Sequence, residues 1–114
     1  RGGATTKTLR ALWGTGTDAT VWAVGDDGLM TQWDGTRWTT SAAPLPVNLH
    51  CIWGRSKSDV WAGGDHGAIF HYDGTAWTLF SVRATGNALY SIYGGSDGSV
   101  WFAGQQSTIL RYQP

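Results

Sequence analysis

Val60-Trp61-Ala62-Gly63-Gly64 is the middle copy of a short apolar block that decides the fold of this chain of 114 residues. Other copies stand about 40 residues to either side, at Val21-Trp22-Ala23-Val24-Gly25 and Val100-Trp101-Phe102-Ala103-Gly104. Residues 21–39 and 60–78 agree at 11 of 19 positions. A period of this length is the signature of a repeat architecture, so the chain contains a duplicated structural unit.

Three further blocks recur with the same period. The first ends in an aromatic residue and glycine, the second runs into Asp-Gly in two of its copies, and the third begins with Trp-Thr. The copies are Leu9–Gly14, Leu49–Gly54 and Leu89–Gly94, then Leu29–Gly35, Ala68–Gly74 and Thr108–Pro114, then Trp38–Thr40 and Trp77–Leu79. All are rich in β-branched and aromatic residues and are bounded by Gly, Asp or Ser, which is typical of strands. The pattern predicts four strands per repeat, over residues 9–48, 49–88 and 89–114, with the outer strand missing from the third.

The residues between these strands predict tight hairpins. Asp27-Gly28 and His66-Gly67 separate the second strand of a repeat from the third. Asp34-Gly35 and Asp73-Gly74 separate the third strand from the fourth. Glycine and aspartate tolerate the positive φ that a type I′ turn or a bulged turn demands, so the sequence predicts antiparallel neighbours within each repeat.

The first strand of each repeat is apolar on both faces, with Leu12, Ile52 and Ile92 opposite the side that carries the aromatic residue. Such a strand is expected to be covered on both sides. Four-stranded antiparallel sheets of about 40 residues that stack face to face are the signature of a β-propeller. The predicted fold class is therefore all-β, a single propeller segment over residues 1–114 that supplies about 2.75 blades.

The repeated motif resembles a known kind of propeller blade. Asp59-Val60-Trp61-Ala62-Gly63-Gly64-Asp65, followed by Tyr72-Asp73-Gly74-Thr75, is similar to blades found in tandem in secreted and surface proteins of myxobacteria and related bacteria. This resemblance implies a bacterial protein that is secreted or held at the cell surface. The hairpin Trp33-Asp34-Gly35-Thr36-Arg37-Trp38 is also similar to blades of small bacterial and fungal fucose-binding lectins, in which short chains join into one ring.

Composition and charge exclude several classes of partner. Eight Lys and Arg balance eight Asp and Glu, so no basic surface for nucleic acid or for an anionic membrane is expected. No apolar run approaches the roughly 20 residues of a membrane helix, so membrane insertion is not expected. The single cysteine rules out an internal disulfide and a cysteine-based zinc cluster.

No constellation of acids points to catalysis. The paired or repeated aspartates all fall in turns, where aspartate caps backbone amides. They are Asp26, Asp27, Asp34, Asp65 and Asp73. The chain is therefore predicted not to be an enzyme, and no catalytic residue is assigned.

Metal and thiol chemistry are not expected either. His50, His66 and His71 stand at unrelated phases of the repeat, without the spacing of metal ligands. Cys51 occupies a small position of an inner strand and is predicted to be a packed, unreactive thiol. The sequence therefore predicts no metal and no cofactor.

The candidate binding residues are polar side chains that differ between otherwise similar repeats, because variety on a fixed scaffold is typical of binding sites. In a propeller, the turns between second and third strands and the crossings between blades gather on one face. The candidates on that face are Asp27, His66, Gln106, Arg10, His50, Tyr90, Asn48, Arg83 and Asn87. A solvated rim without a ligand is the alternative interpretation. The recurring tryptophans are interpreted as packing between blades.

The number of repeats predicts a partner. Each repeat covers its apolar face only against a neighbour, and propellers typically have about four to eight blades. The end repeats keep apolar residues such as Leu12 and Trp101 in place of polar caps. We expect the ring to be completed either by other copies of the chain, with a homodimer of about six blades preferred, or by the remainder of a longer propeller chain.

The sequence thus favours a non-enzymatic binding module with a glycan as the preferred ligand, because weak sugar sites repeated around a ring gain avidity. The alternative is a structural or protein–protein assembly propeller without a small-molecule ligand. A glycoside hydrolase or lyase is the least favoured class, since the sequence presents no convergent acid and base.

Overall fold

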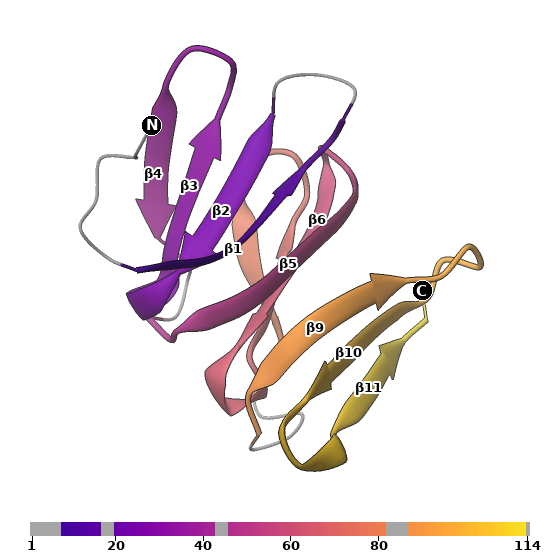
Figure 1. Cartoon of the computed structure of the whole chain (residues 1–114). Helices are drawn as coiled ribbons and strands as arrows, with labels where there is room; N and C mark the ends of the chain where they lie inside the picture. The colour runs from indigo at the N-terminus through magenta and orange to yellow at the C-terminus, as the bar shows by residue number, and fades with distance from the viewer. Residues whose placement is uncertain (1–7, 17–19, 43–45, 82–86, 114) are drawn as a thin grey trace.

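The structure, a computed structural model, describes residues 8–16, 20–42, 46–81 and 87–113. Within these residues three antiparallel sheets follow one another along the chain (Figure 1), and we call them blades 1, 2 and 3. Blade 1 consists of β1 (Leu9–Gly14), β2 (Val21–Gly25), β3 (Leu29–Trp33) and β4 (Trp38–Ala42); blade 2 of β5 (Leu49–Ser56), β6 (Asp59–Gly64), β7 (Ile69–Tyr72) and β8 (Trp77–Ser81); blade 3 of β9 (Leu89–Gly94), β10 (Val100–Gly104) and β11 (Ile109–Tyr112).

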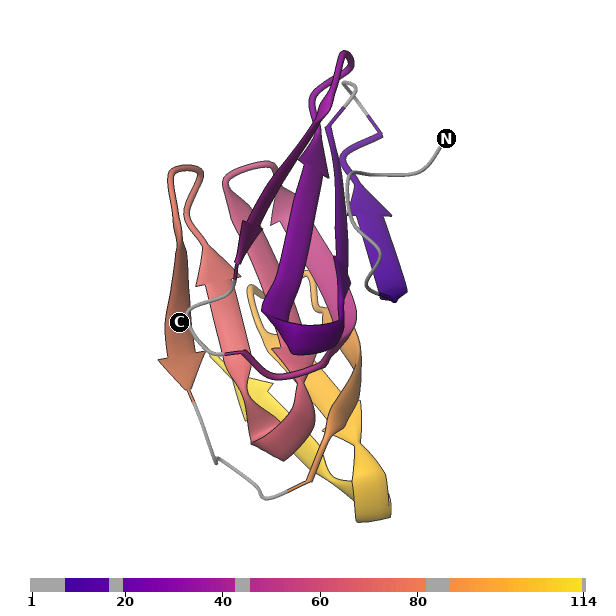
Figure 2. The ribbon, with the colours of Figure 1, turned by 90° about the vertical axis from the view of Figure 1, so that its left-hand side faces the viewer.

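The strands of each blade lie in chain order, from an inner strand to an outer one. The inner strands β1, β5 and β9 are neighbours. The sheets pack face to face, blade 1 on blade 2 and blade 2 on blade 3, as the two views turned by 90° show (Figures 1 and 2). The strands coincide with the blocks that the repeat predicts.

The connection between the second and third strands has the same form in every blade. It is a tight turn, at Asp26–Gly28 (η1), Asp65–Gly67 (η2) and Gln105–Ser107 (η3), whose second and third residues have left-handed backbone angles. The central residue has positive φ in each case, 56° at Asp27, 63° at His66 and 56° at Gln106. The positive φ predicted at Asp-Gly and His-Gly is confirmed. None of the helical segments in the described residues is long or apolar enough to cross a membrane.

Aspartates close the hairpins at the other end of blades 1 and 2. The Asp34 carboxylate accepts hydrogen bonds from the backbone N–H groups of Arg37 and Thr36, at 3.0 and 2.9 Å. Asp73 repeats this arrangement in blade 2. These backbone donors hold the pKa of both carboxyl groups below the usual range, which confirms the capping role predicted for these two aspartates.

A second contact ties each crossing to the blade that it enters. The N–H of Asp65 donates to the carbonyl oxygen of Asn48 at 3.0 Å, and equivalent bonds occur in blades 1 and 3. The chain segments approach so closely that a Cβ on Gly64 would collide with the Asn48 carbonyl group. The close approach explains why the Val-Trp block ends in glycine in each repeat.

Aromatic rings near the ends of the inner strands pack on glycines of the next blade. Trp13 of β1 lies over Gly54 of β5, where an added Cβ would be 2.6 Å from Trp13 Cη2. Trp53 lies over Gly94 of β9 in the same way. Because interiors are close-packed, only glycine leaves room for a ring at this distance. The aromatic-Gly pair of the first block is therefore the joint between neighbouring blades.

Two apolar cores fill the spaces between the blades. The core between blades 1 and 2 includes Trp22 and Phe70, and the core between blades 2 and 3 includes Trp61 and Phe102. Each of these side chains is at most 5% exposed. The interpretation of the Val-Trp tryptophans as packing between blades is thus correct for Trp22 and Trp61.

The prediction that every inner strand is covered on both sides is correct only for β5. Leu12 of β1 is 72% exposed and Tyr93 of β9 is 68% exposed, because within the described residues no further sheet packs on the outer faces of blades 1 and 3. Ile52, at the position of Leu12, packs against the core between blades 1 and 2. Each end blade therefore presents an apolar flank.

Replacing Gly94 by alanine is expected to lower the free energy of unfolding by about 1–3 kcal/mol, because the new Cβ overlaps the Trp53 ring. Urea denaturation followed by fluorescence measures the loss. In the double variant Gly94→Ala with Trp53→Leu, the smaller side chain relieves the overlap, so the combined loss should be less than the sum of the two single losses. Strictly additive losses would contradict the ring-on-glycine contact.

Candidate functional site

A row of paired polar side chains crosses the blades on the face where the turns η1, η2 and η3 lie. Arg10 of β1 forms an ion pair with Asp26. His50 holds the same position in β5, and its Nε2 lies 2.7 Å from Asp65 Oδ1. Tyr90 holds it in β9, and its ring meets the His50 ring edge-on, with centroids 4.9 Å apart. We call these five residues the turn-face row.

The charges of the row act on one another across the joint between blades 1 and 2. The hydrogen bond from Arg10 holds the pKa of the Asp26 carboxyl group below its usual range, and His50 acts in the same direction. The pKa of Arg10 is raised by Asp26 above all, and also by Asp65. A carboxylate of blade 2 therefore contributes to the field at a cation of blade 1.

Three further predicted residues form the tips of the turns beside the row. Asp27, His66 and Gln106 are exposed, and all have positive φ. A residue other than glycine in this region costs of order 1 kcal/mol in backbone strain. The chain keeps this conformation with three different side chains, so the tips present three different polar groups to the solvent.

The predicted asparagines take part in hydrogen bonds within the fold. Asn48 Oδ1 accepts the backbone N–H of Asp27 at 3.0 Å, so the crossing into blade 2 holds the turn of blade 1. Asn87 Nδ2 donates to Thr108 Oγ1 at 2.8 Å in blade 3. Arg83 lies outside the described residues. The structure thus places three predicted residues in the row, three at the tips and two in contacts that hold the turn face.

Asp26 and Asp65 belong to the row but are not among the predicted site residues. The interpretation of these two as caps of backbone amides is wrong, because their carboxylates bind the side chains of Arg10 and His50. The repeat carries a signal for this pairing. Where the head of the inner strand is basic, the residue after the Val-Trp block is aspartate, and where it is tyrosine, that residue is Gln105.

No group of three or more metal-ligating side chains occurs within the described residues. His50 and His71 bind different aspartates at opposite ends of blade 2. Cys51 is 5% exposed, and burial raises the pKa of its thiol to about 12. The prediction of a packed, unreactive thiol is consistent with both values.

A cavity of about 390 Å³ opens between blades 1 and 2. Its walls combine aromatic rings with an amide and hydroxyl groups, and they carry no group that is charged at neutral pH. The lining residues are Trp22, Gln32, Ser41, Tyr72, Thr75, Ala76 and Trp77. The indole N–H groups of Trp22 and Trp77 are buried and find no hydrogen-bond acceptor in the described part of the chain.

Two differences between the repeats leave this cavity open. In blade 2 the outer strand pairs through a register shift, and Phe80 near that shift packs its ring 4.8 Å from the Trp61 ring. In blade 1 the outer strand pairs without a shift and places the small Ser41 in the wall. Gln32 occupies the position that His71 holds in blade 2. The His71 ring is hydrogen bonded to Asp59, whereas the Gln32 side chain has no such ionic partner and lines the cavity.

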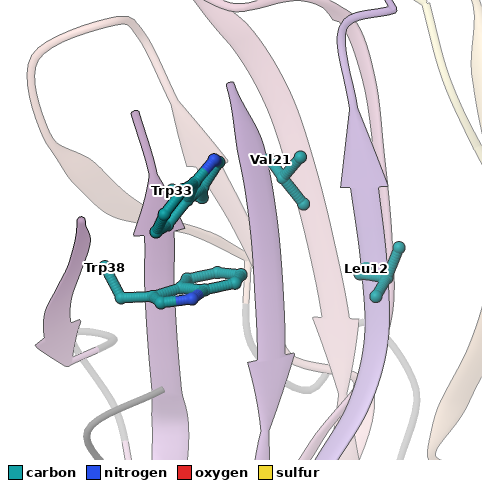
Figure 3. A pocket seen from close by; sticks show the side chains of 4 residues that line it. All are labelled: Leu12, Val21, Trp33 and Trp38. Atoms are coloured by element: carbon teal, nitrogen blue, oxygen red, sulfur yellow. The ribbon is translucent and has the colours of Figure 1, made fainter. Parts of the chain in front are cut away.

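The open flank of blade 1 carries a shallow hollow of about 270 Å³, lined by Leu12, Val21, Trp33 and Trp38 (Figure 3). The two indole rings lie with centroids 5.5 Å apart. In blade 2 the residues at their positions, Tyr72 and Trp77, pack against Trp22 of the preceding blade, at 5.0 and 5.3 Å. The hollow therefore lies where a preceding blade would insert its own tryptophan.

Of three comparisons with known proteins, only the comparison with solved structures finds matches. The sequence matches no family model and no curated protein. Among solved structures, the one described as "YCF48 bound to D1 peptide" is a β-propeller that aligns with 97% of this chain, at a TM-score of 0.81 and 21% sequence identity. The chain has a β-propeller fold. It spans 38% of the length of that solved chain, and the predicted fold class is confirmed.

Because the Cys51 thiol has a pKa of about 12, iodoacetamide at pH 8 is expected to modify the folded propeller segment at least about tenfold more slowly than the same chain in urea. The thiolate is the reactive form, and burial suppresses both its formation and its contact with the reagent. Mass spectrometry over a time course measures both rates. Equal rates in the folded and unfolded chain would show that Cys51 is not packed.

Proposed function

We propose that the chain is part of a non-enzymatic β-propeller whose turn face binds a peptide segment of another protein. The turn-face row is the observation that carries this proposal. It places a guanidinium, two carboxylates, an imidazole and a phenol at the heads of three successive inner strands and in the turns beside them. An extended peptide offers charged side chains and backbone hydrogen-bonding groups to such a series of polar groups.

The way in which the fold holds the side chains of the turn-face row favours a role in ligand binding. Each member is held at the head of an inner strand or in a turn that is hydrogen bonded to a crossing, so little ordering is needed on binding. The His50–Asp65 pair has no hydroxyl or thiol hydrogen bonded to the ring within the described residues, as a nucleophile activated by histidine requires. The solved propeller with a bound peptide supports a peptide as the ligand class.

We also propose that further blades complete the ring around this face, either in other copies of the chain or in the remainder of a longer propeller. The exposed side chains of the two flanks, including Leu12, Tyr93 and Ile109, support this proposal. Burying apolar surface stabilises a protein by about 25 cal/mol for each Å², so flanks that stay in water forgo this stabilisation. Contiguous exposed apolar patches of this kind mark interfaces.

The peptide proposal is tested with random 12-residue peptides displayed on phage and selected on the immobilised chain. Selected peptides are then measured by fluorescence anisotropy. Arg10→Ala and the double variant Asp27→Ala/His66→Ala are expected to raise Kd by about tenfold or more, because each removes charged or polar contacts from the turn face. Thr36→Ala, in an exposed hairpin at the opposite end of blade 1, is the matched control and should leave Kd unchanged.

The unmodified chain and all variants should give the same circular dichroism spectrum and the same number of chains per particle. Failure to select any peptide, or peptides that bind the turn-face variants as tightly as the unmodified chain, would contradict the proposal.

A glycan is a second candidate ligand, and the cavity between blades 1 and 2 is the observation that favours it. Aromatic rings stack on sugar faces, while Gln32, Ser41 and Thr75 offer hydrogen bonds to hydroxyl groups. The absence of charged lining suits a neutral sugar. A volume of about 390 Å³ lies within the usual range for small-ligand pockets.

Titration with a panel of methyl glycosides, followed by tryptophan fluorescence, tests this candidate. Ser41→Phe is expected to abolish any fluorescence change, because the ring fills the cavity as Phe80 fills the neighbouring interface. Thr40→Phe, on the opposite side of the same strand, should keep the response. No response of the unmodified chain to any glycoside, or the same response from Ser41→Phe, would exclude the cavity as a sugar site.

A further inference from the structure

The two joints inside the chain follow one rule. In each, the aromatic residue at the end of an inner strand lies over a glycine of the next inner strand, Trp13 over Gly54 and Trp53 over Gly94. Beside it, the tryptophan of the second strand meets a tyrosine of the following blade, with ring centroids at 5.0 Å for Trp22 and Tyr72. The equivalent pair in the next joint has its centroids 5.4 Å apart.

The flank of blade 3 carries the first half of a third joint. Tyr93, Trp101 and Ile109 are 68%, 38% and 67% exposed. At the positions of the last two, Trp61 and Ile69 of blade 2 are 5% and 4% exposed in the joint with blade 3. The Arg111 guanidinium lies 5.2 Å from the Trp101 ring, much as the His71 ring lies over Trp61. The side chain beside the second-strand tryptophan is thus placed on this flank as it is in the joint between blades 2 and 3.

The flank of blade 1 carries the second half. Leu12, Val21 and Trp33 line its hollow, and Gly14 ends the inner strand. A Cβ on Gly14 would meet only the Thr20 carbonyl oxygen at 3.3 Å and Val21 Cγ2 at 3.4 Å, and no aromatic ring. Nothing in the described chain uses the space above Gly14, although Gly54 and Gly94 at the same position each receive a ring.

We propose that a second copy of this chain docks its blade 3 flank on the blade 1 flank of the first, with Tyr93 over Gly14 and Trp101 beside Trp33. This docking rests on the proposed ring closure, and it identifies the further blades as those of a second copy of the chain. One copy presents both halves of the joint, so two copies satisfy each other head to tail and close by rotation. The chain has zero formal net charge, so two copies do not repel each other.

Two copies supply about six blades, a number within the usual range of propeller rings. The surface that becomes buried lies on the two apolar flanks, and the polar turn face stays outside it. The turn-face rows of the two copies would then lie on the same side of one ring. Association therefore leaves the row free for its own ligand.

Light scattering coupled to size exclusion tests the proposal on the whole chain. The expected mass is about 25 kDa, twice the 12.3 kDa of one chain, with no growth at higher concentration. In Gly14→Ala the new Cβ blocks the incoming ring and lies 3.3 Å from the Thr20 carbonyl oxygen, so a circular dichroism spectrum checks that blade 1 keeps its fold. Tyr93→Ser removes the ring itself. Each variant is expected to raise the Kd of the dimer by at least about tenfold. Leu79→Ser, at an exposed apolar position of blade 2, is the matched control and keeps the dimer mass.

A particle of one chain, or a series of masses that grows with concentration, would overturn the proposal. So would a Gly14→Ala variant that dimerises as tightly as the unmodified chain while its circular dichroism spectrum is unchanged. Peptide binding to the turn face is measured separately from mass, so a monomer that still binds peptide would contradict only the second copy, and a dimer without peptide binding would contradict only the peptide.

Discussion

The contact between an aromatic ring and a glycine of the next inner strand sets the spacing of the blades. Trp13 over Gly54 and Trp53 over Gly94 bring β1, β5 and β9 into neighbouring positions. With the inner strands fixed, the Val-Trp tryptophans reach across to the following blade and the two cores close. The same small set of contacts repeats, so the stability of the segment is a sum of joints between neighbours.

The turn face depends on this spacing. His50 meets Tyr90 because β5 and β9 lie side by side, and Asp65 acts on Arg10 because β1 and β5 do. The bond from Asp27 to Asn48 adds a link between the turn of one blade and the crossing into the next. A row of polar groups is thereby held at fixed intervals without any long loop. Packing between apolar faces and recognition on the turn face are two consequences of one geometry.

Much of the fold can be predicted from the repeats in the sequence. The strands, the positive φ at Asp27 and His66 and the burial of Trp22 follow from short patterns, because turn chemistry and alternation act over a few residues. The candidate site is different. The partner of Asp26 is Arg10, on another strand, and a capping role is the local alternative that sequence reasoning favours.

The cavity between blades 1 and 2 shows another limit of sequence reasoning. The alignment of the repeats places Ser41 at the position of Phe80, so the difference in side-chain size is visible in the sequence. Whether this position faces a joint between blades or the solvent depends on how the outer strand pairs, and that pairing is irregular near Phe80 but regular at Ser41. Only the structure shows Phe80 packed on Trp61 and Ser41 in the cavity wall.

Nuclear magnetic resonance of the folded chain tests the central claim most directly. Nuclear Overhauser contacts are expected between the Trp53 ring protons and the α-protons of Gly94, and the ring current should shift those α-protons upfield. The same pattern is predicted for Trp13 and Gly54. Glycine α-protons at random-coil shifts, without contacts to either ring, would contradict the account.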